Sequence, residues 1–425
     1  MKDKSICLLI IAVMILSGCY HDNSEFGVDF SALPTHGLAF VPYKERDYEF
    51  GAIGKIGVPT SVTEVRDTAG RNVRMASSID GIGLARGLTD GLNATTIHQV
   101  SGTYLSDDGE GNKIPLSGAV YYPKRGRIKG IIVSCHYTVC ADYEVPSQTC
   151  FMDAWMATKG YVLIMPDYMG YGSSSEYVHP YFQGEMTGRH VTDMILAVRS
   201  FLADREIQVE SPEIILTGYS QGAHAVMHTL RMIEDKETYK EYADAQILIK
   251  KCMTGGGMYS VSDFYEKCCE ENYVPIPCAV PMLVLGMNVG RKNAFDPEYF
   301  FTDLTLNNYE EWILSKRYSL DQINEMIGTG HLSTVLKNKA FSGLSNESKA
   351  FNAELRRHDV PSDFAPEAPL WIFHSRNDDV VDFSQAELLR EHLEHSGVKA
   401  EYDFGDYGIH GLGYVRFLMK VYSKL

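Results

Sequence analysis

The stretch EIILTGYSQGAHAVMHTL, residues 213–230, decides the fold. Its first half contains the short apolar run Ile214–Leu216, which is typical of a strand buried on both faces. In its second half apolar residues return every three or four positions, which predicts a helix with one apolar face (Val226, Met227, Leu230). Between the two halves, Gly218 and Gly222 stand two residues before and two residues after Ser220. Glycines at these positions let a strand and a helix pass closely around a sharp turn with a serine at its apex.

Further buried strands are predicted on both sides of this stretch, and amphipathic helices separate them. Such alternation implies an α/β fold with a mostly parallel sheet and helices on both faces. The expected strands are 128–134, 161–165, 213–217, 246–253, 370–373 and 399–404, and the expected helices follow residue 183, span 383–395 and begin near 412. Residues 96–106 and 114–122 alternate around a turn rich in Asp and Gly, so they predict a β-hairpin.

The remaining segments divide the chain. Residues 258–365 interrupt the alternation of strands and helices with aromatic residues and helical pieces, so they are interpreted as an inserted, mainly helical cap. The core is thereby split into 96–257 and 366–425. Residues 19–95 are rich in Gly, Ser, Asp and Thr, as in a tether followed by an irregular N-terminal extension. A length of 425 residues would also fit two or three average domains.

Composition limits the function classes. With 45% hydrophobic and 22% charged residues the chain is an ordinary globular protein that can form a large core. Its formal charge of -16 argues against a nucleic-acid partner, because such proteins neutralise phosphates with a basic face. The oligomeric state cannot be derived from the sequence.

Five motifs together resemble those of the α/β-hydrolase superfamily, over roughly residues 96–257 and 366–425. The first is the strand, G-x-S-x-G and helix just described, which matches the nucleophile elbow. Pro166–Gly172 (PDYMGYG) is similar to a turn of secretory lipases and related esterases, where it has an architectural role. The others are an oxyanion loop in 131–138, an acid loop in 374–381 and a histidine loop in 408–411. The resemblance implies the α/β-hydrolase fold, a Ser-His-Asp triad and no metal or organic cofactor.

The resemblance assigns the triad to Ser220, Asp378 and His410. A serine hydroxyl needs a base to remove its proton and a carboxylate to orient that base. His410 lies where the family places its histidine, before the final helix. Asp378 aligns with the acid of a D-x-x-V loop, with Asp379 and Asp382 as alternatives.

The resemblance also implies two backbone N–H donors for the oxyanion. Gln221, directly after the serine, supplies one. The second belongs to the loop after strand 128–134, where Tyr137 stands in place of the glycine that many family members have after His136. This departure leaves Tyr137 and Thr138 as alternatives.

The N-terminus predicts export. Lys2 and Lys4 precede an apolar run that is too short to span a membrane, which is typical of a signal peptide over residues 1–18. The run ends in Leu16–Cys19, which resembles the lipobox of bacterial lipoproteins. The resemblance implies a lipid anchor on Cys19 and a location in the bacterial cell envelope.

Seven cysteines remain after Cys7 and Cys19, and in an oxidising compartment some could pair. Cys140 with Cys150, and Cys268 or Cys269 with Cys278, are the local candidates. A metal site at Cys268 and Cys269 is disfavoured, because no further ligands follow at zinc-site spacing.

The predicted function is that of a carboxylic ester hydrolase, an esterase or lipase acting on a small-molecule, lipid or glycan ester. A carbohydrate esterase that removes acetyl or feruloyl groups and a peptidase of the same fold are the alternatives. A surface binding protein on an inactive hydrolase scaffold is a further alternative from a different class.

Overall fold

The apolar runs of the sequence form the buried strands of one large sheet. A computed structural model describes residues 28–50, 64–66, 72–74, 95–292 and 294–425. Within them, one 9-stranded sheet has the order β1-β4-β5-β7-β6-β8-β9-β10-β11, and β2 pairs with β3. The strands are β1 (Val41–Phe50), β2 (Glu64–Arg66), β3 (Asn72–Arg74), β4 (Thr95–Asp107), β5 (Lys113–Pro123), β6 (Gly130–Cys135), β7 (Tyr161–Pro166), β8 (Ile214–Tyr219), β9 (Ile249–Gly255), β10 (Leu370–Ser375) and β11 (Ala400–Gly405).

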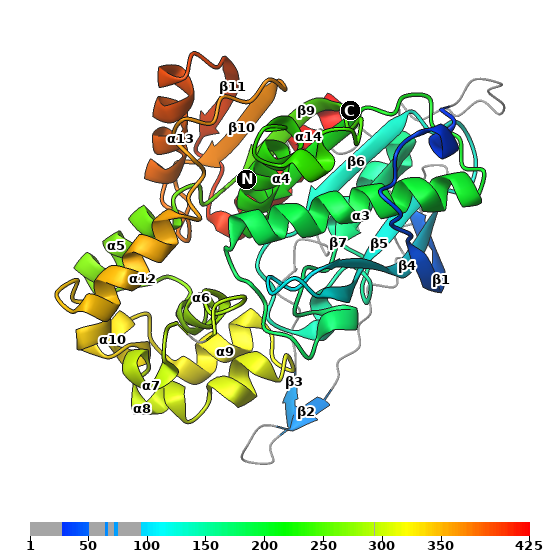
Figure 1. Cartoon of the computed structure of the whole chain (residues 1–425). Helices are drawn as coiled ribbons and strands as arrows, with labels where there is room; N and C mark the ends of the chain where they lie inside the picture. Colours follow the sequence, from blue (N-terminus) through cyan, green and yellow to red (C-terminus); the bar gives the residue numbers. More distant parts are fainter. Residues whose placement is uncertain (1–27, 51–63, 67–71, 75–94, 293) are drawn as a thin grey trace, which may run out of the picture.

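The sheet is parallel from β7 to β11, whereas β1, β4 and β5 are antiparallel. This topology confirms the predicted mostly parallel sheet, and the pairing of β4 with β5 confirms the hairpin. Residues of β6, β7, β8 and β10 are buried throughout, because helices cover both of their faces. In Figure 1, α3 and α4 lie in front of the sheet and α14 lies behind it. The helices that belong to the core are α3 (Gly184–Asp204), α4 (Gln221–Glu234), α13 (Ser384–His395) and α14 (His410–Lys424), with the short turns η1 (Phe30–Ala32), η3 (Asp142–Glu144), η4 (Met152–Lys159), η5 (Gly172–Ser174) and η6 (Lys240–Tyr242).

Between β9 and β10 the chain leaves the sheet and forms a separate group of helices. They lie together at one side of the sheet core in Figure 1. They are α5 (Val261–Glu271), α6 (Ala279–Gly286), α7 (Pro297–Phe300), α8 (Asp303–Leu306), η7 (Glu310–Leu314), α9 (Leu320–Ile327), α10 (Leu332–Val335), α11 (Asn338–Phe341) and α12 (Asn346–Arg356). Most of their buried residues form a second hydrophobic cluster beside the one around the sheet, and this second cluster also includes Cys140, Tyr181, Phe182 and Val381 of the core. We refer to residues 258–365 as the cap.

The structure differs from the prediction of an irregular N-terminal extension at residues 41–50. They form β1, which pairs with β4 at the edge of the sheet. Charged residues at 44–47 hid this strand in the sequence, because exposed edge strands tolerate charges. The predicted signal peptide and Cys19 lie outside the described residues. No helix in the described part of the chain is long and apolar enough to cross a membrane.

Candidate active site

Ser220 occupies a strained turn between β8 and α4. Its backbone dihedrals are φ 58° and ψ −122°, a conformation that non-glycine residues adopt only where the surroundings enforce it. The surroundings are tight on both sides. A Cβ on Gly218 would lie 2.2 Å from the Gly222 carbonyl oxygen, and one on Gly222 would lie 1.9 Å from the Cys135 carbonyl oxygen. The two glycines therefore let α4 approach both its own strand and the end of β6.

Replacing Gly222 with alanine is expected to destabilise the protein by about 2–4 kcal/mol, because its clash is with backbone that cannot move aside. Gly411→Ala is the matched control, since a Cβ there meets nothing within 4 Å. Urea unfolding of both variants measures the difference. Equal stabilities would contradict the close approach of α4 to β6.

Asp378 and His410 form a hydrogen-bonded pair at the end of the neighbouring strands. Asp378 lies in the loop after β10, and His410 is the first residue of α14, where the sequence had placed it just before the helix. The His410 Nδ1 atom is 2.7 Å from Asp378 Oδ2 and 3.0 Å from Oδ1. Burial acts to raise the pKa of Asp378, but the hydrogen bond and charge of His410 outweigh it and hold that pKa below its ordinary value.

The two alternative acids have other partners. Asp379 Oδ1 accepts the backbone N–H of His410 at 2.9 Å, so it holds the histidine's main chain rather than its ring. Asp382 Oδ2 pairs with Lys267 of the cap at 3.2 Å, and its Oδ1 accepts the N–H of Ser384. Of the three carboxylates, the structure brings Asp378 to the imidazole.

Tyr219 connects the serine to the histidine. Its hydroxyl donates to the His410 carbonyl at 2.8 Å, and its ring centroid lies 4.9 Å from that of His410. Among the described residues no hydrogen bond joins Ser220 Oγ to the His410 ring, and such bonds are often long before substrate binds. The sequence reasoning missed Tyr219, although its place directly before Ser220 in G-x-S-x-G was a signal.

Ser375, at the end of β10, ties the acid loop to the histidine loop. Its hydroxyl donates to the Gly408 carbonyl at 2.6 Å and accepts the N–H of Tyr407 at 3.0 Å. The residues that lead into His410 are therefore fixed to the strand that carries Asp378.

The candidate oxyanion segment, residues 136–139, is held by its carbonyl groups. Tyr168 and Tyr171 of the PDYMGYG turn donate to the carbonyls of His136 (3.1 Å) and Val139 (2.6 Å). The His136 ring Nδ1 lies 2.6 Å from the Tyr137 carbonyl, to which it donates. In a trans peptide the N–H points opposite to the C=O, so the N–H groups of Tyr137 and Thr138 face away from these anchors.

Neither the N–H of Tyr137 nor that of Thr138 has a hydrogen-bond partner in the described part of the chain, so both remain candidates for the second oxyanion donor. The Tyr137 ring packs against Phe151 and Tyr414, with the Tyr414 centroid 5.0 Å away. Tyr168 and Tyr171, which hold this segment, were not singled out from the sequence. Their place in the PDYMGYG turn, which has an architectural role in the family, was the signal that could have identified them.

The side chain of Gln221 contacts His179. Its Nε2 lies 2.8 Å from His179 Nε2. His179 donates from Nδ1 to the Met169 carbonyl at 2.8 Å, so its Nε2 accepts. Burial lowers the pKa of His179 to about 3, which keeps the ring neutral. The N–H of Gln221 belongs to the first turn of α4, where no helix carbonyl is available to it. His179 had no signal in the sequence.

Glu144 binds the main chain directly after the oxyanion segment. Its Oε2 accepts the N–H of Cys140 at 3.3 Å and that of Ala141 at 3.1 Å. Burial raises the pKa of this carboxyl to about 7, against these two hydrogen bonds. The protonated form is thus favoured in the folded state relative to the unfolded chain.

Glu144→Gln is expected to flatten the pH dependence of stability. Because the folded pKa is raised, the contribution of Glu144 is fully present below its unfolded value and is lost as the pH rises through about 7. Glutamine keeps an acceptor oxygen and does not ionise. Between pH 5 and pH 8 the wild type should lose about 1–2 kcal/mol more unfolding free energy than the variant. Parallel pH profiles of the two proteins would exclude this assignment.

Tyr414 of α14 packs against both Tyr137 of the oxyanion segment and Tyr219 before the serine. Its hydroxyl donates to Asp153, which is fully buried and also accepts from Ser134 Oγ at 2.6 Å. Its ring lies 5.0 Å from Tyr137 and 5.4 Å from Tyr219, measured between centroids. One side chain therefore contacts the oxyanion segment and the residue that precedes Ser220.

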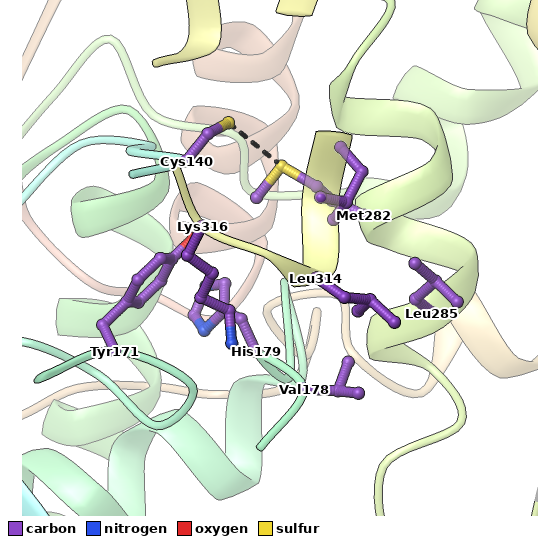
Figure 2. Close-up of a pocket in the computed structure, with 9 residues that line it drawn as sticks. Cys140, Tyr171, Val178, His179, Met282, Leu285, Leu314 and Lys316 are labelled. Atoms are coloured by element: carbon purple, nitrogen blue, oxygen red, sulfur yellow. Dashed lines mark hydrogen bonds between the residues drawn. The ribbon is translucent and has the colours of Figure 1, made fainter. Parts of the chain in front are cut away.

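The cap packs against the core next to Cys140, which follows the candidate oxyanion segment. Figure 2 shows a small cavity between Tyr171 and His179 of the core and apolar side chains of the cap. Its free space is about 10 Å³, room for about one water molecule. Lys316 lines it and donates from Nζ to the carbonyls of Ser175 (2.9 Å) and Tyr177 (2.5 Å). Burial lowers the pKa of Lys316 to about 8. The cap and the core are therefore in close contact here.

Other residues of the motifs have structural roles. Asp167 accepts from Ser117 Oγ at 2.6 Å and from the Ser147 N–H at 2.8 Å, which agrees with the architectural role that the resemblance implies for the PDYMGYG turn. His224 and His228 of α4 are buried and both contact the carbonyl of His358, so they belong to the core.

Comparisons with known proteins agree on the architecture. The model of the prolyl oligopeptidase family matches residues 147–242. A search of curated proteins finds no match. The ligand-bound rice cell wall degrading esterase LipA from Xanthomonas oryzae is similar in structure, with a TM-score of 0.70 and 20% identity over 91% of this chain and 98% of that one. Candida antarctica lipase A in its closed state has a TM-score of 0.58 and 14% identity over 77% of this chain and 78% of that one. At these identities the likeness shows the fold.

Proposed function

Because the chain has the α/β-hydrolase fold, we propose that it is a serine hydrolase that cleaves carboxylic esters, with Ser220 as the nucleophile. The observation that carries the proposal is the contact of Asp378 with the His410 ring, 2.7 Å from Nδ1 to Oδ2, beside a serine held at φ 58°. A nucleophile on a strained turn, followed along the chain by an acid and then a base, supplies the parts that acyl transfer requires.

The geometry supports a two-step reaction. Asp378 accepts a hydrogen bond from the Nδ1–H of His410, which leaves Nε2 unprotonated and free to remove the proton from Ser220. Ser220 Oγ then attacks the ester carbonyl, and the N–H of Gln221 with that of Tyr137 or Thr138 stabilises the oxyanion. His410 returns the proton to the leaving alcohol. Water, activated by His410, then hydrolyses the acyl-enzyme.

The ester is the favoured substrate because both structural neighbours named above are described as an esterase and a lipase. LipA is described as a cell wall degrading esterase, which supports a carbohydrate ester as one candidate class of ester substrate. A peptidase is the second candidate, and the family model matched over 147–242 is the observation that favours it. Initial rates on p-nitrophenyl esters from acetate to palmitate, on acetylated and feruloylated glycans and on an aminoacyl anilide separate these. Turnover of the anilide alone would overturn the ester assignment.

Labelling distinguishes an enzyme from a binding protein on the same scaffold. A fluorophosphonate probe reacts with an activated serine, so we expect it to label the wild type and not Ser220→Ala. Folded wild-type protein that fails to react would refute the proposed catalysis.

We further propose that the mature protein is anchored through lipid on Cys19 in a bacterial cell envelope. The charged start, the apolar run and Leu16–Cys19 support this location. In a bacterial host the wild type should fractionate with membranes, and Cys19→Ala should not. Equal distribution of the two would count against the anchor.

A further inference from the structure

Two buried cysteines face each other across the boundary between the core and the cap. Cys140 follows the candidate oxyanion segment, and Cys278 lies at the N-terminal end of α6 in the cap. Their Sγ atoms are 4.0 Å apart, although the two residues are 138 positions apart in the chain. Both side chains are almost fully buried, with 3% and 0% exposed. The fold therefore brings one thiol of each part into contact.

Each cysteine is fixed by its own part of the molecule. The N–H of Cys140 donates to Glu144, and the carbonyl of the preceding Val139 accepts from Tyr171. The N–H of Cys278 donates to Asn324 Oδ1 of α9 at 2.9 Å. Because both main chains are held in this way, bringing the sulfurs together needs side-chain rotation between rotamers.

We propose that Cys140 and Cys278 form a disulfide bond that fastens the cap to the oxyanion segment when the protein matures under oxidising conditions. In the reaction the two thiols give up two protons and two electrons to the disulfide of a thiol oxidant. One S–S bond forms between Cys140 and Cys278, and the oxidant's S–S bond breaks to give two thiols. The sulfurs must close from 4.0 Å to about 2.05 Å.

The pairs that spacing favoured do not meet. All seven described cysteines are free thiols, and no hydrogen bond among the described residues joins Cys140 to Cys150 or Cys278 to Cys268 or Cys269. Cys135 and Cys252 lie within the buried strands β6 and β9. The position of Cys140 beside Cys278 instead results from the insertion of the cap, which folds back onto the segment after β6.

Burial affects the reactivity of the Cys140 thiol. Contact with Cys278 and burial both raise the pKa of the Cys140 thiol, so the reactive thiolate is scarce once the cap has closed. Oxidation of the folded protein is therefore expected to be slow, which is why the oxidant is supplied during refolding in the disulfide-mapping experiment. A bond that closes so long a loop also restricts the unfolded chain, which stabilises the folded protein.

Disulfide mapping of the full chain tests the proposal without any activity measurement, so it can fail independently of the proposed hydrolase. The chain is refolded in a mixture of reduced and oxidised glutathione, alkylated and digested without reduction. Cleavage at Tyr137 separates Cys135 from Cys140, and cleavage at Glu271 separates Cys269 from Cys278. The expected product is a linked peptide pair that contains Cys140 and Cys278. Recovery of both as free thiols from folded protein, or a link to another cysteine, would overturn the proposal.

Thermal unfolding provides the second measurement. The oxidised wild type should melt about 5 °C above its reduced form. This difference should vanish in Cys140→Ser and in Cys278→Ser, and the control Cys268→Ser should keep it. A difference that persists in Cys140→Ser would assign the stabilisation to another pair.

Discussion

Ser220→Ala is expected to lower kcat on a p-nitrophenyl ester by about 10⁴- to 10⁶-fold. The variant keeps the substrate-binding groups and the oxyanion donors but has no atom to form the acyl-enzyme, so only the slow attack of water remains. Alanine fits the site of Ser220, which tolerates a Cβ already. The measurement is the initial rate at saturating ester, with circular dichroism to confirm folding.

Ser396→Ala is the matched control, because this serine lies on the surface and donates only to the Ser362 carbonyl. It should retain wild-type activity. If Ser220→Ala kept a tenth or more of the wild-type rate, the assignment of the nucleophile would be wrong.

Asp378→Asn is expected to reduce kcat by about 10⁴-fold through the tautomer of His410. Asp378 Oδ1 accepts the N–H groups of Val380 (3.0 Å) and Val381 (2.8 Å), and Oδ2 lies nearest His410 Nδ1. Asparagine would keep its oxygen on the two N–H groups and turn its NH₂ to His410. An NH₂ donor requires an unprotonated Nδ1 as its acceptor. The ring proton therefore moves to Nε2, and the ring can no longer act as the base.

Asp379→Asn tests the same loop without this effect. Its side-chain oxygen can still accept the backbone N–H of His410, so a loss below about tenfold is expected. A larger loss in Asp379→Asn than in Asp378→Asn, measured as kcat on the same ester, would transfer the role of the acid to Asp379.

Local patterns were sufficient to predict much of this molecule. The strand and helix around Ser220, the hairpin of β4 and β5 and the mostly parallel character of the sheet all follow from short-range periodicity and glycine positions. Asp378 could be singled out because the turn after β10 has a recognisable sequence, and the structure places it at His410. These features depend on neighbours within about ten residues, which is what a single sequence expresses.

The remaining features depend on contacts between distant segments. β1 carries the charges of an edge strand, so only its pairing with β4 identifies it. The hydrogen bond of His179 with Gln221 joins residues 42 positions apart, and the Cys140–Cys278 contact depends on how the cap folds back. No local signal distinguishes such residues from others of their type, because packing alone decides which of them meet.

The separate hydrophobic cluster of the cap has an evolutionary consequence. Its buried side chains, such as Phe300, Phe301, Leu332 and Phe351, belong to one cluster, and the strands that carry the catalytic candidates belong to the other. Substitutions inside the cap can therefore accumulate and change its packing against the core while Ser220, Asp378 and His410 keep their positions. In a chain built this way, selection can exchange one substrate for another without rebuilding the catalyst.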